Sequence, residues 1–333
     1  MALDKADSEG PYPWHCTQWA ALTRDPMRLS HALLLRGQPG LGKYAFAKRL
    51  ARALLCARSG QGLKACGLCK SCRLYAAGTH PDFAPIEPAE EGRAITVDQV
   101  RALVAFATTR PHTADRKVVI IRPADAMNLN AANSLLKVLE EPPLGNVLIL
   151  ISSEPAKLPA TVRSRCQRVD FKPPSHQDAI AWLEAQSPDC PGVGLLLELA
   201  GGAPLRALEL AEADFLRHRH ELFADICALS GQEADPVSCA ARWHRIGTVP
   251  CLGWLQGLIA DLVKLAMASG ESIGVTNADL ASDLHTMSER LNLQRLYWFA
   301  DTLAETRDLL TTPVDDLLLL EDILIGWTRL TRE

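Results

Sequence analysis

The sequence predicts an α/β domain with a parallel sheet, followed by a region built only of helices. Two observations carry this prediction. Up to about residue 171, short apolar runs alternate with helical patterns, as in βαβ units. After Pro173 and Pro174 the strand-like runs disappear and only helical periodicity remains. With 333 residues, the chain is also long enough for two or three domains.

Five runs are predicted to be the buried parallel strands, because they are rich in leucine and β-branched residues. They lie at residues 31–35, 83–86, 118–121, 147–151 and 168–171. Thr96 and Gln99 have the spacing of a capping box, which predicts a helix start there. Another helix is predicted over residues 131–141, ending at Pro142, whose ring removes a backbone donor.

The helical half is predicted from apolar residues at the spacing of one helix face, and the clearest sets are Leu255, Leu258, Leu262 and Leu265, then Leu317, Leu320, Leu324 and Trp327. Thr312 is predicted to cap the last helix, with Pro313 in its first turn. We expect three domains, at residues 1–171, 172–212 and 213–333, with a cysteine-rich module at about 56–72.

Composition indicates a globular protein of a reducing compartment. Hydrophobic residues make up 48% of the chain and charged residues 22%. Residues 1–29 carry several charges and no run reaches membrane length, so we expect a cytoplasmic protein with no membrane partner. The net charge of −4 argues against strong nucleic-acid binding, although a local basic patch would be hidden in the total.

A phosphate-binding loop follows the first predicted strand. Residues 37–43 read Gly-Gln-Pro-Gly-Leu-Gly-Lys, in which Gly37, Gly40 and Gly42 let the backbone approach a phosphate and Lys43 supplies charge. A working loop has Ser or Thr next, to hold magnesium, but this chain has Tyr44. ATP binding is therefore expected to be absent or vestigial. Residual nucleotide binding and a purely structural turn remain as alternatives.

The second half of a nucleotide-hydrolysing site is also altered. An acidic residue that holds magnesium is expected at the end of the strand at 118–121, but Arg122 and Pro123 stand there. A turn through Pro123 is expected to keep Asp125 from reaching back to the loop. Two independent departures predict that the chain does not hydrolyse ATP.

Four closely spaced cysteines predict a zinc site. Cys56, Cys66, Cys69 and Cys72 lie in a polar stretch, and four thiolates suit tetrahedral zinc with no open position, which would make the site structural. Unrelated thiols or a redox relay are the alternatives. The other cysteines, which are Cys16, Cys166, Cys190, Cys227, Cys239 and Cys251, lie far apart in sequence and are expected to be ordinary thiols.

Arg165 lies on the connection between the fourth and fifth predicted strands. A guanidinium in such a loop can be projected into a neighbouring subunit, where it would neutralise charge on a transferring phosphoryl group. Taken alone, the pattern fits a surface ion pair as well.

Several segments together resemble the clamp-loader family of AAA+ proteins. They are the loop at 37–43, the cysteines, His80-Pro81-Asp82, Asn-Ser-Leu-Leu-Lys-Val-Leu-Glu-Glu-Pro-Pro at 133–143, and Ser164-Arg165-Cys166. The resemblance covers residues 31 to about 171. It implies an AAA+ core with a zinc insertion, a small helical lid and an all-α collar. Tyr44, Arg122 and Pro123 resemble the family's members that lack a working ATPase site.

The resemblance also implies partners and residue roles. These are ATPase subunits of the gamma/tau type and a delta subunit in a hetero-pentamer that loads a sliding clamp onto primed DNA within the DNA polymerase III holoenzyme. Arg165 would act as an arginine finger on ATP bound by an adjacent subunit. Ser152, Ser153 and Arg206 occupy the family's sensor positions, with roles that the sequence leaves open. An ATP-hydrolysing clamp-loader subunit and a zinc-dependent DNA-binding adaptor are the alternative functions.

Overall fold

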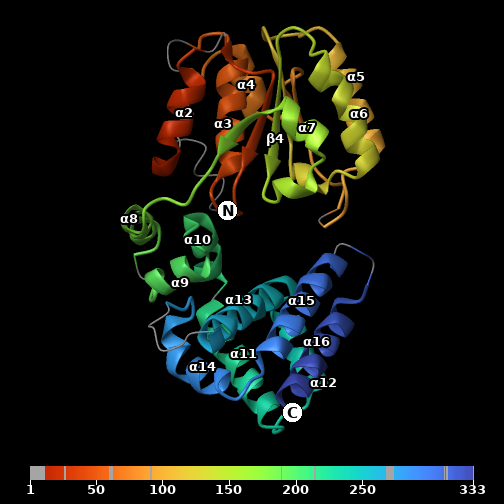
Figure 1. The fold of residues 1–333 in the computed structure, drawn as a ribbon. Coiled ribbons are helices and arrows are strands. Elements are labelled where there is room, and N and C mark those ends of the chain that lie inside the picture. The colour runs from red at the N-terminus through yellow and green to blue at the C-terminus, as the bar shows by residue number, and fades with distance from the viewer. Residues whose placement is uncertain are drawn as a thin grey trace. The chain divides into compact units, whose positions relative to one another are not determined.

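The computed structural model describes residues 12–25, 28–59, 63–90, 92–188, 190–213, 215–267, 274–310, 312 and 314–332. Residues 1–11, part of the charged segment at 1–29, and Pro313, predicted to lie in the first turn of the last helix, lie outside them. The chain divides into two compact units, Met1–Pro174 and Ser175–Glu333 (Figure 1). Each unit is described by itself below.

The N-terminal unit contains a five-stranded parallel sheet in the order β2-β3-β4-β1-β5. The strands are β1 (Ala32–Arg36), β2 (Phe83–Ile86), β3 (Lys117–Ile121), β4 (Asn146–Ser152) and β5 (Gln167–Asp170). All five predicted strands are confirmed, with bounds that differ by at most one residue. The central strands are buried throughout because helices cover both faces of the sheet.

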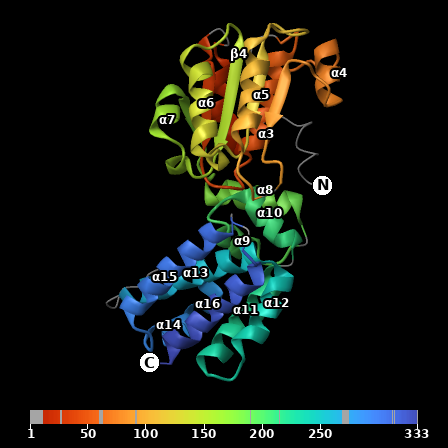
Figure 2. The same cartoon turned by 90° about the vertical axis from the view of Figure 1, so that its right-hand side faces the viewer.

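Helices lie on both faces of the sheet (Figures 1 and 2). Leu34, Val119 and Leu150 share a core with α5 (Val97–Thr108), α6 (Leu129–Glu140) and α7 (Ala160–Arg165). α3 (Lys43–Leu55) lies on the other side of the sheet. α5 begins at the predicted capping box, because Thr96 and Gln99 each accept a hydrogen bond from the other's backbone N–H.

Shorter elements complete this unit. They are η1 (Pro13–His15), α2 (Cys16–Thr23), α4 (Lys70–Ala76), η3 (Ala124–Ala126) and η4 (Pro155–Lys157). Figure 2 shows α4 at the outer edge of the unit.

The C-terminal unit is helical over its described residues. It comprises α8 (His176–Gln186), α9 (Val193–Leu199), α10 (Pro204–Glu212), α11 (Phe215–Ser230), α12 (Pro236–Ile246), α13 (Thr248–Met267), η5 (Ala278–Leu280), α14 (Ala281–Ser288), α15 (Leu293–Leu309) and α16 (Asp316–Thr331). Asp315, not Thr312, caps α16, since its carboxylate accepts the N–H of Leu317 at 2.8 Å. The predicted division of this half at residue 213 stays a prediction.

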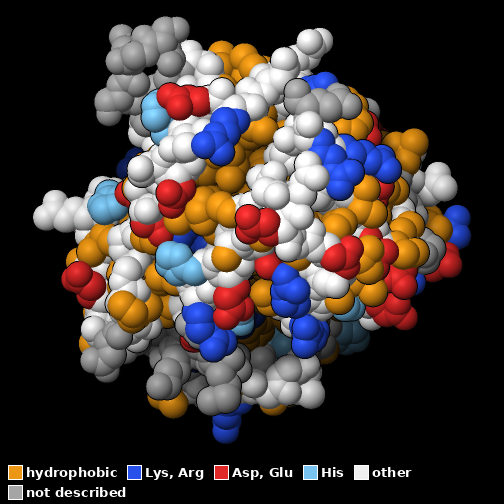
Figure 3. All heavy atoms as spheres, turned by 90° about the horizontal axis from the view of Figure 1, so that it is seen from below, with side chains coloured by type: hydrophobic (Ala, Val, Ile, Leu, Met, Phe, Trp, Pro, Cys, Tyr) orange, Lys and Arg blue, Asp and Glu red, His pale blue; other side chains and the backbone are white. Residues whose placement is uncertain are grey.

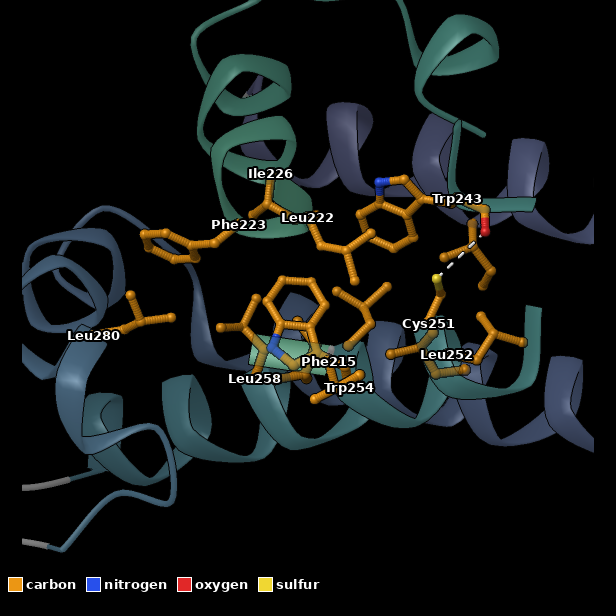
Figure 4. Close-up of a cluster of buried hydrophobic side chains, with 14 of the residues drawn as sticks. Phe215, Leu222, Phe223, Ile226, Trp243, Cys251, Leu252, Trp254, Leu258 and Leu280 are labelled. Atoms are coloured by element: carbon orange, nitrogen blue, oxygen red, sulfur yellow. Dashed lines mark hydrogen bonds between the residues drawn. The ribbon is translucent and has the colours of Figure 1, made fainter. Parts of the chain in front are cut away.

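Aromatic and leucine side chains from α11, α12 and α13 fill the core of this unit (Figure 4). Trp243 and Trp254 meet edge to face, and the thiol of Cys251 donates to the carbonyl of Trp243. Within the described part of the chain, α13 is the one helix long and apolar enough to cross a membrane, yet its Leu255 and Leu258 belong to this core. The face of this unit in Figure 3 mixes cationic and anionic side chains, with hydrophobic ones between them.

Candidate functional site

The phosphate loop joins β1 to α3 and depends on its glycines. Gly37, Gly40 and Gly42 have φ values of +151°, +76° and +79°, which side chains rarely adopt. A Cβ at Gly37 would lie 2.3 Å from the carbonyl oxygen of Phe171, and one at Gly42 would lie 2.6 Å from the ring of Tyr12. The loop therefore has the predicted shape, packed closely against its surroundings.

Lys43 is buried and turns back onto the loop itself. Its ammonium donates to the carbonyls of Gly37 and Gln38, the latter at 2.7 Å, and to the hydroxyl of Ser153 at 3.3 Å. Burial lowers the pKa of Lys43 to about 8, against the opposing effect of the Asp125 charge. All three hydrogens of the ammonium therefore have acceptors within the chain.

The two residues that replace the magnesium ligands are in contact. The guanidinium of Arg122 lies 3.7 Å from the ring centroid of Tyr44, and it also pairs with Glu87 at 3.0 Å. The sequence predicted each departure separately but not their contact. A cation stacked on an aromatic ring stands where a metal-binding hydroxyl and carboxylate are needed, so this arrangement offers magnesium no ligand from either position.

Asp125 is fixed beside the end of β4. The chain turns back through η3 after Pro123, and the Asp125 carboxylate accepts the backbone N–H of Ser153 at 3.2 Å. Its charge also raises the pKa of Lys43. Its carboxylate is held by the backbone after β4, so the expectation that Asp125 does not reach back to the loop stays a prediction.

An aromatic segment before α2 closes over the loop, which sequence reasoning missed. Trp14 Nε1 and His15 Nε2 both bond to the carbonyl of Leu41, at 3.1 and 2.6 Å. Since a carbonyl only accepts, the ring of His15 carries its proton on Nε2. Burial lowers the pKa of His15 to about 4, so the ring is neutral near pH 7. The Tyr12-Pro-Trp-His sequence was the available signal.

The four predicted cysteines come together. The sulfurs of Cys56, Cys66, Cys69 and Cys72 all lie within 4.8 Å of one another. Backbone N–H groups point at them: Arg58 and Cys66 donate to Cys56, and Cys69 donates to Cys66. Hydrogen bonds from the backbone of Leu68 and Cys69 lower the pKa of Cys66 to about 6, which favours a thiolate. The donor set fits a tetrahedral metal ion of the zinc type.

The His80-Pro81-Asp82 motif anchors the cysteine module to the sheet. His80 Nδ1 accepts the backbone N–H of Asp82, so its Nε2 is protonated and donates to Ser71 Oγ at 2.6 Å. Ser71 in turn donates to the carbonyl of Leu55 at the end of α3. The buried carboxylate of Asp82 accepts the backbone N–H groups of residues 112, 113 and 114. The motif is therefore structural, linking α4 to α3 and to the turn before β3.

Arg165 ends α7 and is partly exposed. Its guanidinium pairs with Glu140 at 2.6 Å and donates to the carbonyl of Thr161 at 2.9 Å. Of the predicted sensor residues, Ser153 joins Lys43 at the loop. Ser152 is buried, with no hydrogen-bond partner for its hydroxyl among the described residues. Arg206 pairs with Glu209 on its own helix at 3.0 Å.

Comparison with known proteins agrees with this set of features. Family models described as "DNA polymerase III, delta subunit" and "DNA polymerase III, delta subunit, C terminal" match residues 20–175 and 213–329. The DNA polymerase III subunit delta' of Pseudomonas aeruginosa is 35% identical, over 96% of this chain and 98% of the relative. That of Escherichia coli is 33% identical, over 94% of each chain.

Two further comparisons cover other subunits. The DNA polymerase III subunit tau of Bacillus subtilis is 37% identical over 44% of this chain and 25% of its own length. A solved gamma-subunit-related protein of DNA polymerase III from Thermotoga maritima is 19% identical with a TM-score of 0.41, covering 95% of this chain and 100% of that one. On the near full-length identity to the curated relatives, this chain belongs to the DNA polymerase III subunit delta' family.

Proposed function

We propose that this chain is a clamp-loader subunit that does not hydrolyse ATP and instead assists ATPase neighbours, as part of the complex that loads a sliding clamp onto primed DNA. Its family membership supports the delta' role in DNA polymerase III. The observation that carries the non-hydrolysing part is the stacking of Arg122 on Tyr44.

The chemistry of the loop supports this reading. Phosphoryl transfer from ATP needs a magnesium ion held between loop and strand, to neutralise charge on the β- and γ-phosphates. Arg122 places a positive charge at the strand position, and Tyr44 brings a ring in place of the small hydroxyl. The same contact argues against the alternative of an ATP-hydrolysing subunit.

The partners we propose are ATPase subunits of the gamma/tau type and a delta subunit in a cytoplasmic hetero-pentamer. Exposed hydrophobic side chains on the C-terminal unit support an interface there. They are Tyr297, Trp298, Leu309, Val314 and Leu318, on or beside α15 and α16. Where exposed large hydrophobic side chains adjoin one another, they are typical of a protein–protein contact.

Arg165 is proposed to act in trans as an arginine finger. Its guanidinium is partly exposed at the end of α7 and is held by one carboxylate, Glu140. An exposed pair of this kind contributes little to stability, so exchanging the carboxylate for a phosphate of a neighbour's ATP costs little. A guanidinium at a phosphoryl transition state, by contrast, raises the rate by about 10³-fold or more in related hydrolases.

The cysteine cluster is proposed to hold one structural zinc ion. Four thiolate ligands leave no open position for catalysis. The module between α3 and α4 has few apolar residues to bury, and a metal would supply the folding free energy that packing cannot.

The test is ATP hydrolysis by the reconstituted complex, stimulated by clamp and primed DNA. Arg165→Ala is expected to assemble normally, as judged by size exclusion, and to lower turnover at least tenfold. Arg165→Lys should be nearly as damaging, because a point charge does not reproduce the planar two-donor fork. Arg168→Ala, an exposed arginine on β5, is the matched control. An intact Arg165→Ala complex that turns over at the wild-type rate would exclude the role in trans.

An assay of the isolated chain tests the proposal that it does not hydrolyse ATP. It should release no phosphate from ATP above background, with or without magnesium. Turnover that requires magnesium and disappears in Lys43→Ala would contradict the proposal.

A further inference from the structure

The ion pair between Arg165 and Glu140 joins the ends of two helices. Arg165 is the last residue of α7, Glu140 is the last residue of α6, and Arg165 Nη2 lies 2.6 Å from Glu140 Oε1. With six residues, α7 is too short to be stable alone, so its position depends on packing. Leu139, Val162 and Cys166, beside the charged residues, belong to one buried core. The two charged side chains therefore project from a fixed frame.

The guanidinium of Arg165 is held at two points and is otherwise open. Nη1 donates to the carbonyl of Thr161 at 2.9 Å, one turn earlier on α7, and Nη2 contacts Glu140. A guanidinium has five N–H groups. Within the described part of the chain, Arg165 makes no further hydrogen bond or ion pair, and Glu140 pairs with no other cation. The two side chains are 36% and 49% exposed, so an anion from outside the chain can approach the guanidinium.

A carboxylate and a phosphate are alternative partners for this guanidinium, because both are oxyanions that accept its N–H groups. The pair with Glu140 stabilises only the state in which Arg165 is turned towards its own chain. The free energy that the pair contributes is given up when the guanidinium moves to a phosphate, so the pair shifts the equilibrium away from engagement. After the exchange, the unpaired charge of Glu140 would also repel the phosphates.

We propose that Glu140 is an inhibitory latch on Arg165, which holds the guanidinium on its own chain and withdraws it from ATP on a neighbouring subunit. The inference rests on the arginine-finger role proposed above and adds its regulation. Exposed pairs of this kind shift an equilibrium by about fivefold at most, so the latch lowers engagement without blocking it. A bias of this size is overcome once clamp and primed DNA favour the engaged state.

The test is ATP turnover by the reconstituted complex in the absence of clamp and DNA. Glu140→Gln keeps the shape of the side chain and loses its charge, so turnover should rise about two- to fivefold. Glu140→Ala, which also removes the acceptor, should raise turnover at least as much. The gain over wild type should shrink in high salt, because salt screens the wild-type pair. With clamp and primed DNA present, variant and wild type should differ less than twofold.

A second background shows whether Glu140 acts through Arg165. In an Arg165→Ala complex, adding Glu140→Gln should change turnover less than twofold, because the latch has no guanidinium to hold. A structural role of Glu140 alone would instead affect both backgrounds alike. Glu141→Gln is the matched control, since it removes the same charge from the next, exposed position. Its turnover without clamp and DNA should stay within twofold of wild type.

Three outcomes would overturn the latch while leaving the arginine-finger role intact. In each of them Arg165→Ala slows the stimulated complex. They are a turnover of Glu140→Gln without clamp and DNA that is no higher than wild type, an equal gain in the Arg165→Ala background, and an equal gain with Glu141→Gln. If Arg165→Ala instead turns over at the wild-type rate, the arginine-finger role fails and the latch fails with it.

Discussion

The guanidinium of Arg122 lies 3.7 Å from the ring centroid of Tyr44, so the residues that replace two magnesium ligands form a contact of their own. Arg122 also keeps its ion pair with Glu87. In a working site of this kind, a nucleotide and its metal ion bridge the phosphate loop and the end of β3. Here the side chains of Tyr44 and Arg122 connect these two segments.

This contact is expected to stabilise the N-terminal unit. Single Tyr44→Leu and Arg122→Ala variants and their double variant form a cycle, and the coupling free energy should be about 0.5–2 kcal/mol, as for a partly desolvated cation over a ring. The measurement is urea unfolding. The Glu87 pair survives in Tyr44→Leu and so cancels from the cycle. Additivity within about 0.3 kcal/mol would show that the two side chains are merely neighbours.

One zinc ion per chain is expected by elemental analysis. Cys69→Ser should abolish its binding, because a neutral hydroxyl is a poor zinc ligand, and should speed amide exchange over residues 56–76. Exchange in α11 should not change. Cys190→Ser, outside the cluster, is the control. A metal-free protein whose thermal midpoint does not move on adding zinc would argue for four ordinary thiols.

The sequence predicted features that local chemistry determines. The strands follow from apolar runs, and the start of α5 follows from Thr96 and Gln99. The cap of α16 was predicted wrongly, as Asp315 caps this helix rather than Thr312. The two residues lie close together in the sequence and either side chain can accept a backbone hydrogen bond, so the sequence did not distinguish between them.

The candidate sites also differ in how well the sequence predicted them. The cysteines lie within one short segment, so their spacing was sufficient. Trp19, Lys48 and Tyr75 lie on α2, α3 and α4, and all three line one pocket of the N-terminal unit. Only the packing of these helices brings them together, so their spacing in the sequence could not predict it. The bond between Asp125 and the backbone of Ser153 was missed, because the path of η3 depends on tertiary contacts that a sequence pattern does not contain.

His15 is expected to make the N-terminal unit sensitive to mild acid. Its pKa is lowered from the ordinary 6.5 to about 4 in the folded chain, first by burial. The folded state therefore binds fewer protons than the unfolded state between these values. The contribution of neutral His15 to the free energy of unfolding is therefore fully present above about pH 6.5, and it is lost as the pH falls towards 4.

Urea unfolding between pH 7 and pH 4.5 measures this effect. His15 adds at most about 1.4 kcal/mol per pH unit to the slope of stability against pH. His15→Phe keeps an aromatic ring and should flatten the slope, even though it loses the bond to Leu41. His112→Gln, in the same unit, is the control. Equal slopes for wild type and His15→Phe would mean that the buried ring gains its proton without cost.

The last prediction concerns Arg219, whose side chain is fully buried in the C-terminal unit. Its guanidinium forms a two-pronged pair with Asp279, at 2.6 and 2.8 Å, and donates to Asn277 Oδ1 at 3.1 and 2.9 Å. Asn277 is buried as well and bonds to the carboxylate of Asp261 in α13. The arginine therefore ties the segment before α14 to α11.

Arg219→Ala should lower the free energy of unfolding by about 2–5 kcal/mol, because it removes a fully buried side chain and takes the donor from the buried Asn277 and from the partly exposed Asp279. Arg219→Met should cost less, since an apolar side chain of similar length refills the volume. Arg219→Lys should fall near alanine, because one ammonium cannot reproduce the bonds to both partners. Denaturant unfolding followed by the fluorescence of Trp243, Trp254 and Trp327 measures the loss in this unit. Arg217→Ala, exposed on the same helix, should stay within about 0.5 kcal/mol of wild type. A loss of less than about 1 kcal/mol in the free energy of unfolding of Arg219→Ala would contradict this prediction. Water would then replace the guanidinium at Asp279 and Asn277, and these hydrogen bonds would not be what orders the segment before α14.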